Sequence, residues 1–242
     1  MGDRISKRKF GARSAAVTAV SLSIMPCAAI ALPATVPFYP SVEHASFHQL
    51  VFADDDVAVL RNVYPPHTDS GYHLHPRELF YVVIDPARVG TQKVGQKELT
   101  PPMPLAGSFG YNILTTEPFV HRFFNDDTRT GQNIAIEIRR PAPLGVQLSV
   151  RPANYVQIFD NTRMRAWRLI LASGGAAPAM TQTASGVRVV VRGGLLVTTS
   201  LGLPDQTLAL QKGDFSIQHA SVARALRNAG QETIELVELE LK

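Results

Sequence analysis

The feature that most constrains this fold is a long succession of short apolar segments, each bounded by turn-forming residues. Beyond Pro40, segments such as VAVLRNVY (57–64), LFYVVI (79–84) and GVRVVV (186–191) are separated by clusters of Gly, Pro, Asp and Asn. They recur at a spacing of roughly 8–12 residues, which is typical of sandwiches and barrels. No long stretch has the 3.6-residue periodicity of an amphipathic helix. The sequence therefore predicts an all-β protein.

The strands fall into two sets that look like copies of each other. RALRNAGQETIELVEL (224–239) parallels HRFFNDDTRTGQNIAIEI (121–138), which matches Asn228 with Asn125 at an offset of 103 residues. MRAWRLILASGG (164–175) parallels VAVLRNVYPPH (57–67) at an offset of 107 residues, which matches Gly174 with His67. We therefore expect two homologous β domains, at residues 40–140 and 153–242, joined by a proline-rich linker at residues 141–152.

Residues 1–34 are interpreted as an export signal. MGDRISKRKFGAR (1–13) is basic, SAAVTAVSLSIMPCAAIAL (14–32) is apolar, and small residues suit cleavage after Ala31 or Ala34. An uncleaved membrane anchor is the alternative, but Pro26 and the many Ala, Ser and Thr residues make a poor span. The expected location is therefore the periplasm or the exterior, with no stable membrane insertion after cleavage.

Charge and cysteine content narrow the classes of function. The leading segment carries five basic residues and one acid, and beyond it 19 basic residues stand against 19 acidic ones. A nearly neutral body removes the main electrostatic argument for nucleic-acid binding. SKRKF (6–10) is similar to a twin-arginine export signal, with Lys7 in place of the first arginine. The only cysteine, Cys27, lies in the leading segment, so the remaining chain has no disulfides and depends on its core.

Two histidines stand two residues apart in SGYHLHPRELFYVV (70–83), just before an apolar run. In a strand, side chains at i and i+2 leave the backbone on the same face, so His73 and His75 point together. If the sheet closes into a small barrel, His121 from a distant strand can meet them inside it. Neutral imidazoles, joined by one carboxylate if Glu78 reaches them, suit a divalent transition metal and leave coordination positions open.

These residues resemble the cupin superfamily, whose first motif is G-x5-H-x-H-x3–4-E-x6-G and whose second ends in H-x3-N. HLHPRE supplies His73 and His75, and PFVHRFFN supplies His121 and Asn125. The resemblance covers nearly all residues after Pro40, counting both halves. It implies two tandem cupin-type jelly-roll β-barrels, a bicupin of the RmlC-like type, with a metal held by the histidines and a glutamate at the centre of the first barrel.

The sequence departs from the first motif at several positions. His67 stands where the motif has glycine, Glu78 lies one residue before the expected glutamate, and Asp85–Pro86 replaces the closing glycine. Strand alternation turns Glu78 away from its apolar neighbours unless a bulge re-aims it. Tyr81 shares the alternation of the histidine pair, so it is a candidate pocket wall or hydrogen-bond donor, with a core aromatic as the alternative. The predicted site comprises the metal ligands His73, His75 and His121, Glu78 as fourth ligand or nearby base, and Glu78 and Tyr81 as catalytic candidates.

The second half lacks this set of residues. The two offsets place Met180, Gln182 and Arg224 where the first half has its histidines. Arg224 cannot lose a proton to bind a metal. Loss as a set indicates that the histidines function as a set, although a metal-free first barrel is an alternative. The second barrel is then structural, or it offers a cationic pocket for an anion. The remaining histidines of interest, interpreted as ordinary polar residues, are His44, His48 and His219.

A cupin-type fold does not fix a function, because the superfamily includes oxygenases, isomerases, decarboxylases and binding proteins. The leading hypothesis is an exported enzyme that acts on a small organic molecule with a divalent transition metal (Fe, Mn, Ni, Cu or Zn). Dioxygenase chemistry is the commonest that the resemblance suggests, and an isomerase is a further option. The alternatives are a non-catalytic periplasmic binding protein and a structural or interaction domain. Pairing through edge strands makes a homodimer plausible.

Overall fold

The computed structural model describes residues 38–113, 119–143, 145–148 and 150–242. The regular elements in these residues are β-strands, apart from one short 3-10 turn, η1 (Val42–His44). In these ranges no helix has the length and apolar character needed to cross a membrane. The predicted export signal lies outside the described residues. The all-β prediction is confirmed.

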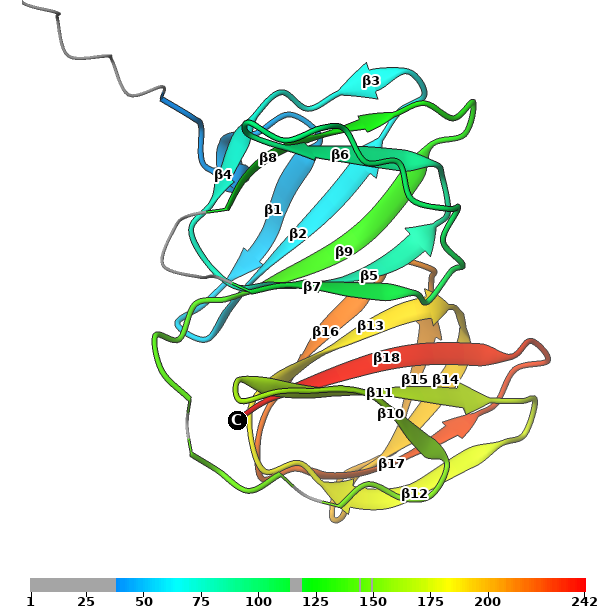
Figure 1. Ribbon diagram of the computed structural model, residues 1–242. Helices are drawn as coiled ribbons and strands as arrows, with labels where there is room; N and C mark the ends of the chain where they lie inside the picture. The colour runs from blue at the N-terminus through cyan, green and yellow to red at the C-terminus, as the bar shows by residue number, and fades with distance from the viewer. Residues whose placement is uncertain (1–37, 114–118, 144, 149) are drawn as a thin grey trace, which may run out of the picture. The chain divides into compact units, whose positions relative to one another are not determined.

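The first barrel consists of two antiparallel sheets (Figure 1). One sheet has the strand order β1-β2-β9-β5-β7, and in the other β8 pairs with β3, β4 and β6. The strands are β1 (His48–Ala53), β2 (Val57–Tyr64), β3 (Thr68–Asp69), β4 (His73–His75), β5 (Leu79–Asp85), β6 (Val89–Lys93), β7 (Phe109–Asn112), β8 (Phe119–Asn125) and β9 (Gly131–Ile138).

The second barrel repeats this arrangement (Figure 1). One sheet has the order β10-β11-β18-β13-β16, and the other has the order β12-β17-β14-β15. The strands are β10 (Tyr155–Asp160), β11 (Met164–Leu171), β12 (Ala176–Thr181), β13 (Gly186–Arg192), β14 (Gly194–Thr199), β15 (Gln206–Leu210), β16 (Phe215–Gln218), β17 (Ala223–Asn228) and β18 (Ile234–Leu241). The described residues therefore form two tandem jelly-roll barrels. The precise limits expected for the domains and the linker stay predictions.

The turns held by Asn125 in the first barrel and Asn228 in the second have the same set of side-chain hydrogen bonds. The side-chain amide of Asn125 donates to three backbone carbonyl oxygens, and that of Asn228 donates to the three at the corresponding positions. The backbone N–H of His67 donates to Asn125 O at 2.9 Å, as that of Gly174 donates to Asn228 O at 3.2 Å. His67 and Gly174 both have left-handed φ angles, +56° and +72°. Such a backbone favours glycine, which explains the glycine of the motif at this position.

The five-stranded sheets of the two barrels share one apolar core. Alternate residues of β5 point in opposite directions, so Phe80, Val82 and Ile84 join this shared core while Leu79 and Tyr81 face the first barrel's interior. The second barrel supplies Met164, Val187, Val189, Val237, Leu239 and Leu241 to the shared core.

The interiors of the two barrels differ in how they are filled. A second core of buried side chains occupies the interior of the second barrel, including Trp167, Leu196 and Leu236. The corresponding cluster of the first barrel is small and is formed around Val42 and Leu60. The first barrel therefore has room inside for something other than its own side chains.

Candidate metal centre

Strands β4 and β8 bring the predicted histidines together. His73 lies directly opposite His121 in the antiparallel pairing of these strands. His73 and His75 are buried, with exposed fractions of 0% and 2%, while Leu74 between them is half-buried and points the other way. The strand alternation expected from the sequence therefore operates in β4, and both imidazoles face the interior.

The three imidazole rings lie in mutual contact. The Nε2 atoms of His75 and His121 are 3.0 Å apart. The ring centroid of His73 is 4.7 Å from that of His121 and 5.1 Å from that of His75. Since a metal–imidazole bond is about 2.0–2.1 Å long, two nitrogens bound to one ion lie about 3–4 Å apart. The separation of His75 and His121 suits a shared ion.

A fourth histidine joins this cluster, and the sequence interpretation missed it. His48, at the start of β1, has a ring centroid 4.6 Å from that of His73. One ligand atom from each of His48, His73 and His75 lies within 4.8 Å of the others. The sequence interpretation treated His48 as an ordinary polar residue, whereas the structure places it beside His73 and His75. Its counterpart in the second barrel is Tyr155, since both strands begin in the same register, so His48 was lost there together with the other three.

The hydrogen bonds of the Nδ1 atoms show which tautomer each ring adopts, and therefore whether its Nε2 atom carries a lone pair. His48 Nδ1 lies 2.9 Å from the carbonyl oxygen of Ser46, and His73 Nδ1 lies 3.0 Å from that of Gly71. A carbonyl oxygen only accepts, so both Nδ1 atoms carry the proton and both Nε2 atoms are free to bind a metal. The Nε2 atom of His73 is buried and has no hydrogen-bond partner in the described structure.

The same reasoning applies to His121. Its Nδ1 atom lies 3.0 Å from the hydroxyl oxygen of Thr91, and that hydroxyl donates to the carbonyl oxygen of Arg122 at 3.2 Å. The hydroxyl proton is thereby used, so His121 Nδ1 is the donor and Nε2 carries a lone pair. Two lone pairs 3.0 Å apart would repel each other, so either the hydrogen of a neutral His75 Nε2–H or a metal ion lies between His75 Nε2 and His121 Nε2. The donor set fits a divalent metal.

Burial keeps these rings neutral, which metal binding requires. Burial, followed by the neighbouring charge on His73, lowers the pKa of both His48 and His121 to about 3. Burial also lowers the pKa of His73, and burial together with the other histidines lowers the pKa of His75 well below its usual value. At neutral pH the cluster therefore presents nitrogen lone pairs and does not have to release protons first.

Glu137 on β9 lies behind the cluster and is a second residue that the sequence interpretation missed. Its carboxylate is fully buried, with Oε1 3.8 Å from His75 Nδ1 and Oε2 3.6 Å from Arg77 Nη1. Burial raises the pKa of Glu137 to about 7, although Arg77 opposes the shift. A carboxylate behind a metal-binding histidine orients the ring and makes it more basic. Its position in an otherwise apolar strand, IAIEI, was the available signal.

The structure does not bring Glu78 to the histidines. Glu78 precedes β5 and has the same alternation as Phe80, so its side chain points toward the second barrel, where Oε2 lies 3.1 Å from Arg163 Nε. Glu78 lies one residue before the position of the motif's glutamate, and no bulge turns its side chain back toward the histidines. Tyr81 has the opposite alternation and lines the interior cavity, as expected for a pocket wall. Burial raises the pKa of Tyr81, so its hydroxyl stays protonated.

A cavity of about 390 Å³ adjoins the histidine cluster. His48, His75 and His121 reach its wall, together with Tyr81 and Lys93. Its apolar lining includes Leu79, Val83, Pro101, Pro102, Phe109, Phe119 and Phe123. This size and this mixture of an apolar wall with a few polar groups are typical of a small-molecule site.

Comparisons with known proteins agree with this architecture. No family model matches the chain, and no curated protein matches it significantly. Among solved structures, AerE from Microcystis aeruginosa has a TM-score of 0.56 at 14% identity, over 79% of this chain and 90% of its own. Salicylate 1,2-dioxygenase from Pseudoaminobacter salicylatoxidans, in adducts with gentisate, has a TM-score of 0.55 at 14% identity, over 77% and 68%. A cupin domain from Bordetella pertussis has a TM-score of 0.34 at 21% identity, over 39% and 98%.

The fold is that of a bicupin. The identities are low, so the likeness extends to the fold and carries no activity with it. Within the bicupin fold, the cavity and the histidine cluster belong to the first barrel.

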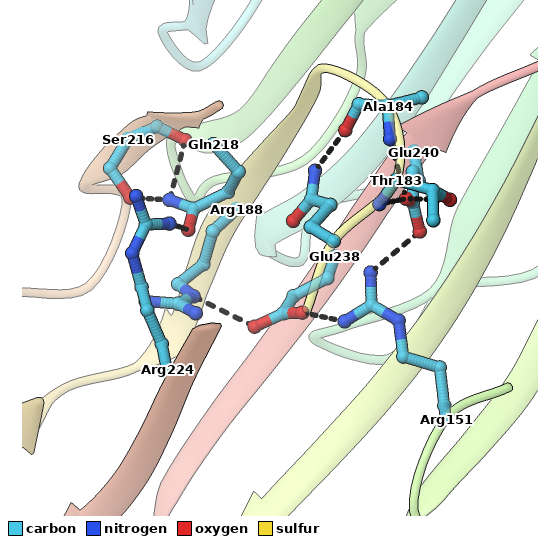
Figure 2. A network of polar contacts seen from close by, with 10 residues as sticks. Arg151, Thr183, Ala184, Arg188, Ser216, Gln218, Arg224, Glu238 and Glu240 are labelled. Carbon is cyan, nitrogen blue, oxygen red and sulfur yellow. Dashed lines mark hydrogen bonds and ion pairs between the residues drawn. The ribbon is translucent and has the colours of Figure 1, made fainter. Parts of the chain in front are cut away.

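The second barrel has a network of ion pairs at the positions that correspond to the candidate metal centre (Figure 2). Met180 lies opposite Arg224, as His73 lies opposite His121. Arg224 donates to Gln218 at 2.7 Å, and no metal ligand stands at its position.

Arg151 enters this network from the segment that precedes β10 (Figure 2). It pairs with Glu238 and, at 3.1 Å, with Glu240, the counterpart of Glu137. Its guanidinium also lies 4.1 Å from the ring centroid of Trp167. In the second barrel, paired charged side chains therefore occupy the space that corresponds to the histidine cluster of the first barrel.

Proposed function

We propose that this bicupin is a metal-dependent enzyme of the dioxygenase type, acting on a small organic molecule in the cavity of the first barrel. The observation that carries the proposal is a cluster of four histidines beside a mostly apolar cavity: His48, His73 and His75 have ligand atoms within 4.8 Å of one another, and His121 Nε2 lies 3.0 Å from His75 Nε2. The likeness to salicylate 1,2-dioxygenase supports it at the level of the fold. The identity of the metal is left open.

The side chains around the cavity have distinct roles in this proposal. His73, His75 and His121 would hold the metal, with His48 as the fourth ligand. A divalent redox metal bound there would supply Lewis acidity toward substrate oxygens and a site for O2. Glu137, with Oε1 3.8 Å from His75 Nδ1, would orient the His75 ring through its charge. Tyr81 keeps its proton and can donate a hydrogen bond to a substrate oxygen, while the apolar wall excludes water.

A second candidate function is a non-catalytic binding protein, and one observation favours it. Glu78, the predicted acid or base, points toward the second barrel and not into the cavity. Tyr81 lines the cavity, but burial raises its pKa, so its hydroxyl stays protonated and does not act as a base. A pocket that only binds a ligand needs no base.

Metal analysis and oxygen consumption together test the proposal. The full chain is loaded separately with Fe(II), Mn(II), Ni(II), Cu(II) and Zn(II), its metal content is measured, and O2 uptake is followed with a panel of small aromatic and aliphatic acids and alcohols. We expect about one metal per chain and uptake with a redox metal but not with Zn(II). Stoichiometric metal and ligand binding without turnover would favour the binding protein, and absence of metal under every condition would reject the metal-dependent enzyme.

We also propose that the protein is exported. The support is the basic and apolar leading segment and a remaining chain without cysteine. Fractionation of cells that express the full chain tests this: mature protein shortened by about 31 or 34 residues in the periplasm or medium is expected. Full-length protein in the cytoplasm would overturn it.

A further inference from the structure

Lys93 places a positive charge at the wall of the cavity. It is the last residue of β6 and lies opposite His121 in the pairing of β6 with β8. Its Nζ atom is 5.0 Å from the ring centroid of Phe119, and that ring lies 4.5 Å from the ring of His121. Lys93 is exposed, and among the described residues no carboxylate forms an ion pair with it.

The other charged groups near the cavity are already compensated or set back from it. Asp85 also reaches the cavity wall, but its carboxylate pairs with Lys212. Glu137 lies behind His75, faces Arg77 and does not line the cavity. Lys93 is therefore the uncompensated charge on the wall of this cavity in the described chain.

A metal ion held by the histidines would add to the positive charge that Lys93 places at the cavity wall. Imidazoles bind a metal as neutral ligands, and the carboxylate of Glu78 points away from the four histidines. A divalent ion held by neutral ligands keeps its full charge toward the cavity, and Lys93 adds to it. A concave surface of one charge with apolar walls concentrates ligands of the opposite charge.

The apolar wall restricts what else the ligand can be. Phe119 and Phe123 flank His121, with ring centroids 4.5 and 5.9 Å from it, and Leu79 and Phe109 also line the cavity. A phosphate dianion calls for several convergent donors, typically a bidentate arginine. No arginine lines this cavity in the described residues. One lysine beside aromatic rings suits a monoanion with an apolar body.

We propose that the cavity binds a small carboxylic acid, with its carboxylate beside Lys93 and its apolar, ring-sized body against Phe119 and Phe123. This inference rests on the proposed function, because it names the substrate class of the same site. It also holds for the metal-free protein, since Lys93 and the aromatic wall do not depend on the ion.

Benzoate and benzamide are a matched pair of probes for this proposal, because they share a ring and differ in charge. Isothermal titration of the full, cobalt-loaded protein is expected to show benzoate binding about tenfold or more tightly than benzamide. Lys93→Met keeps an apolar stem over Phe119 and removes the charge. This variant is expected to bind benzoate about tenfold more weakly and to bind benzamide with unchanged affinity. Lys93→Arg is expected to retain most of the benzoate affinity.

Lys97→Met is the matched control, since Lys97 is exposed on the same segment but does not line the cavity. It should leave both affinities unchanged. Repeating the titrations with metal-free protein separates this inference from the proposed function. If no metal binds but benzoate still depends on Lys93, the metal-dependent function fails and the carboxylate site stands. Equal affinities for benzoate and benzamide would overturn the carboxylate site. So would a benzoate affinity that Lys93→Met leaves unchanged in both the cobalt-loaded and the metal-free protein.

Discussion

The two barrels share one topology and one set of turn hydrogen bonds, yet their interiors are opposites. Where the first barrel has His48, His73, His75 and His121 around a cavity, the second has Tyr155, Met180, Gln182 and Arg224. The first interior offers lone pairs and space, and the second is filled with paired charges and apolar side chains. The comparison teaches that strand pairing sets the fold, while a few inward-facing residues decide whether a barrel can hold a ligand.

Arg151 is central to the filled barrel. Its side chain is 3% exposed, pairs with two buried carboxylates and lies over the Trp167 ring. Burial alone would raise the pKa of Glu238, but the guanidinium groups of Arg188 and Arg151 lower it, so this carboxylate stays charged. A buried charge is tolerated only while it is paired. The second barrel therefore depends on a buried arginine, whereas Arg77, which faces the buried Glu137 in the first barrel, is partly exposed.

The largest expected effect is the loss of bound metal when a histidine of the first barrel is replaced, compared with no loss for the matching change in the second barrel. His75→Ala removes a central nitrogen and should reduce bound metal from about one per chain to near zero without unfolding the barrel. Gln182→Ala, at the corresponding position of the second barrel, should leave the content unchanged. Elemental analysis of both purified variants, with circular dichroism to verify folding, provides the measurement. Full metal retention in His75→Ala would show that the cluster is not the metal site.

The next effect concerns stability and falls on the second barrel. Arg151→Ala leaves two buried carboxylates without this partner and should lower the free energy of unfolding by about 3–5 kcal/mol. Lys212→Ala removes an exposed pair with Asp85 and should cost about 0–1 kcal/mol. Urea denaturation compares the two variants. Similar losses would mean that the buried network contributes no more than a surface contact.

His48→Gln tests whether the fourth histidine belongs to the metal centre. Loss of one nitrogen should weaken metal binding by at least about tenfold, the effect expected even for a residue that only supports a ligand. Tyr155→Phe, at the matching position of the second barrel, should have no effect. Competition with a chelating dye gives the affinities. An unchanged affinity in His48→Gln would return His48 to the role of an ordinary polar residue.

The same variant gives a prediction for pH. The pKa of His48 in the folded protein is about 3, below its unfolded value of 6.5, so unfolding takes up a proton between these values. Stability of the metal-free protein should therefore fall as pH decreases from 6.5 toward 3. His48→Gln should reduce this slope by up to about 1.4 kcal/mol per pH unit. Urea denaturation at several pH values in the presence of a chelator measures it, and parallel slopes would contradict the assigned shift.

The sequence predicted what depends on local alternation and on the internal repeat. The strand pattern gave the all-β class, the offsets matched Asn125 with Asn228, and the spacing of His73 and His75 placed both rings on one face. His48 and Glu137 were missed because their role comes from strand pairing: β1 and β9 reach the cluster through the sheet, and no motif spacing connects them to it. Glu78 was placed near the metal by the family resemblance, against its own strand alternation.

The smallest expected effect is that of Glu78→Gln, and a second carboxylate of the first barrel, Glu137, provides the contrast. Glu78→Gln should leave metal content unchanged and cost about 1 kcal/mol, because its partly buried carboxylate pairs with Arg163 of the second barrel. Glu137→Gln should instead weaken metal binding by about 10–100-fold, because Glu137 supports the His75 ring. Dye competition and urea denaturation measure both. Loss of metal on Glu78→Gln would restore Glu78 as a ligand, and it would require this residue to turn from the shared core into the cavity.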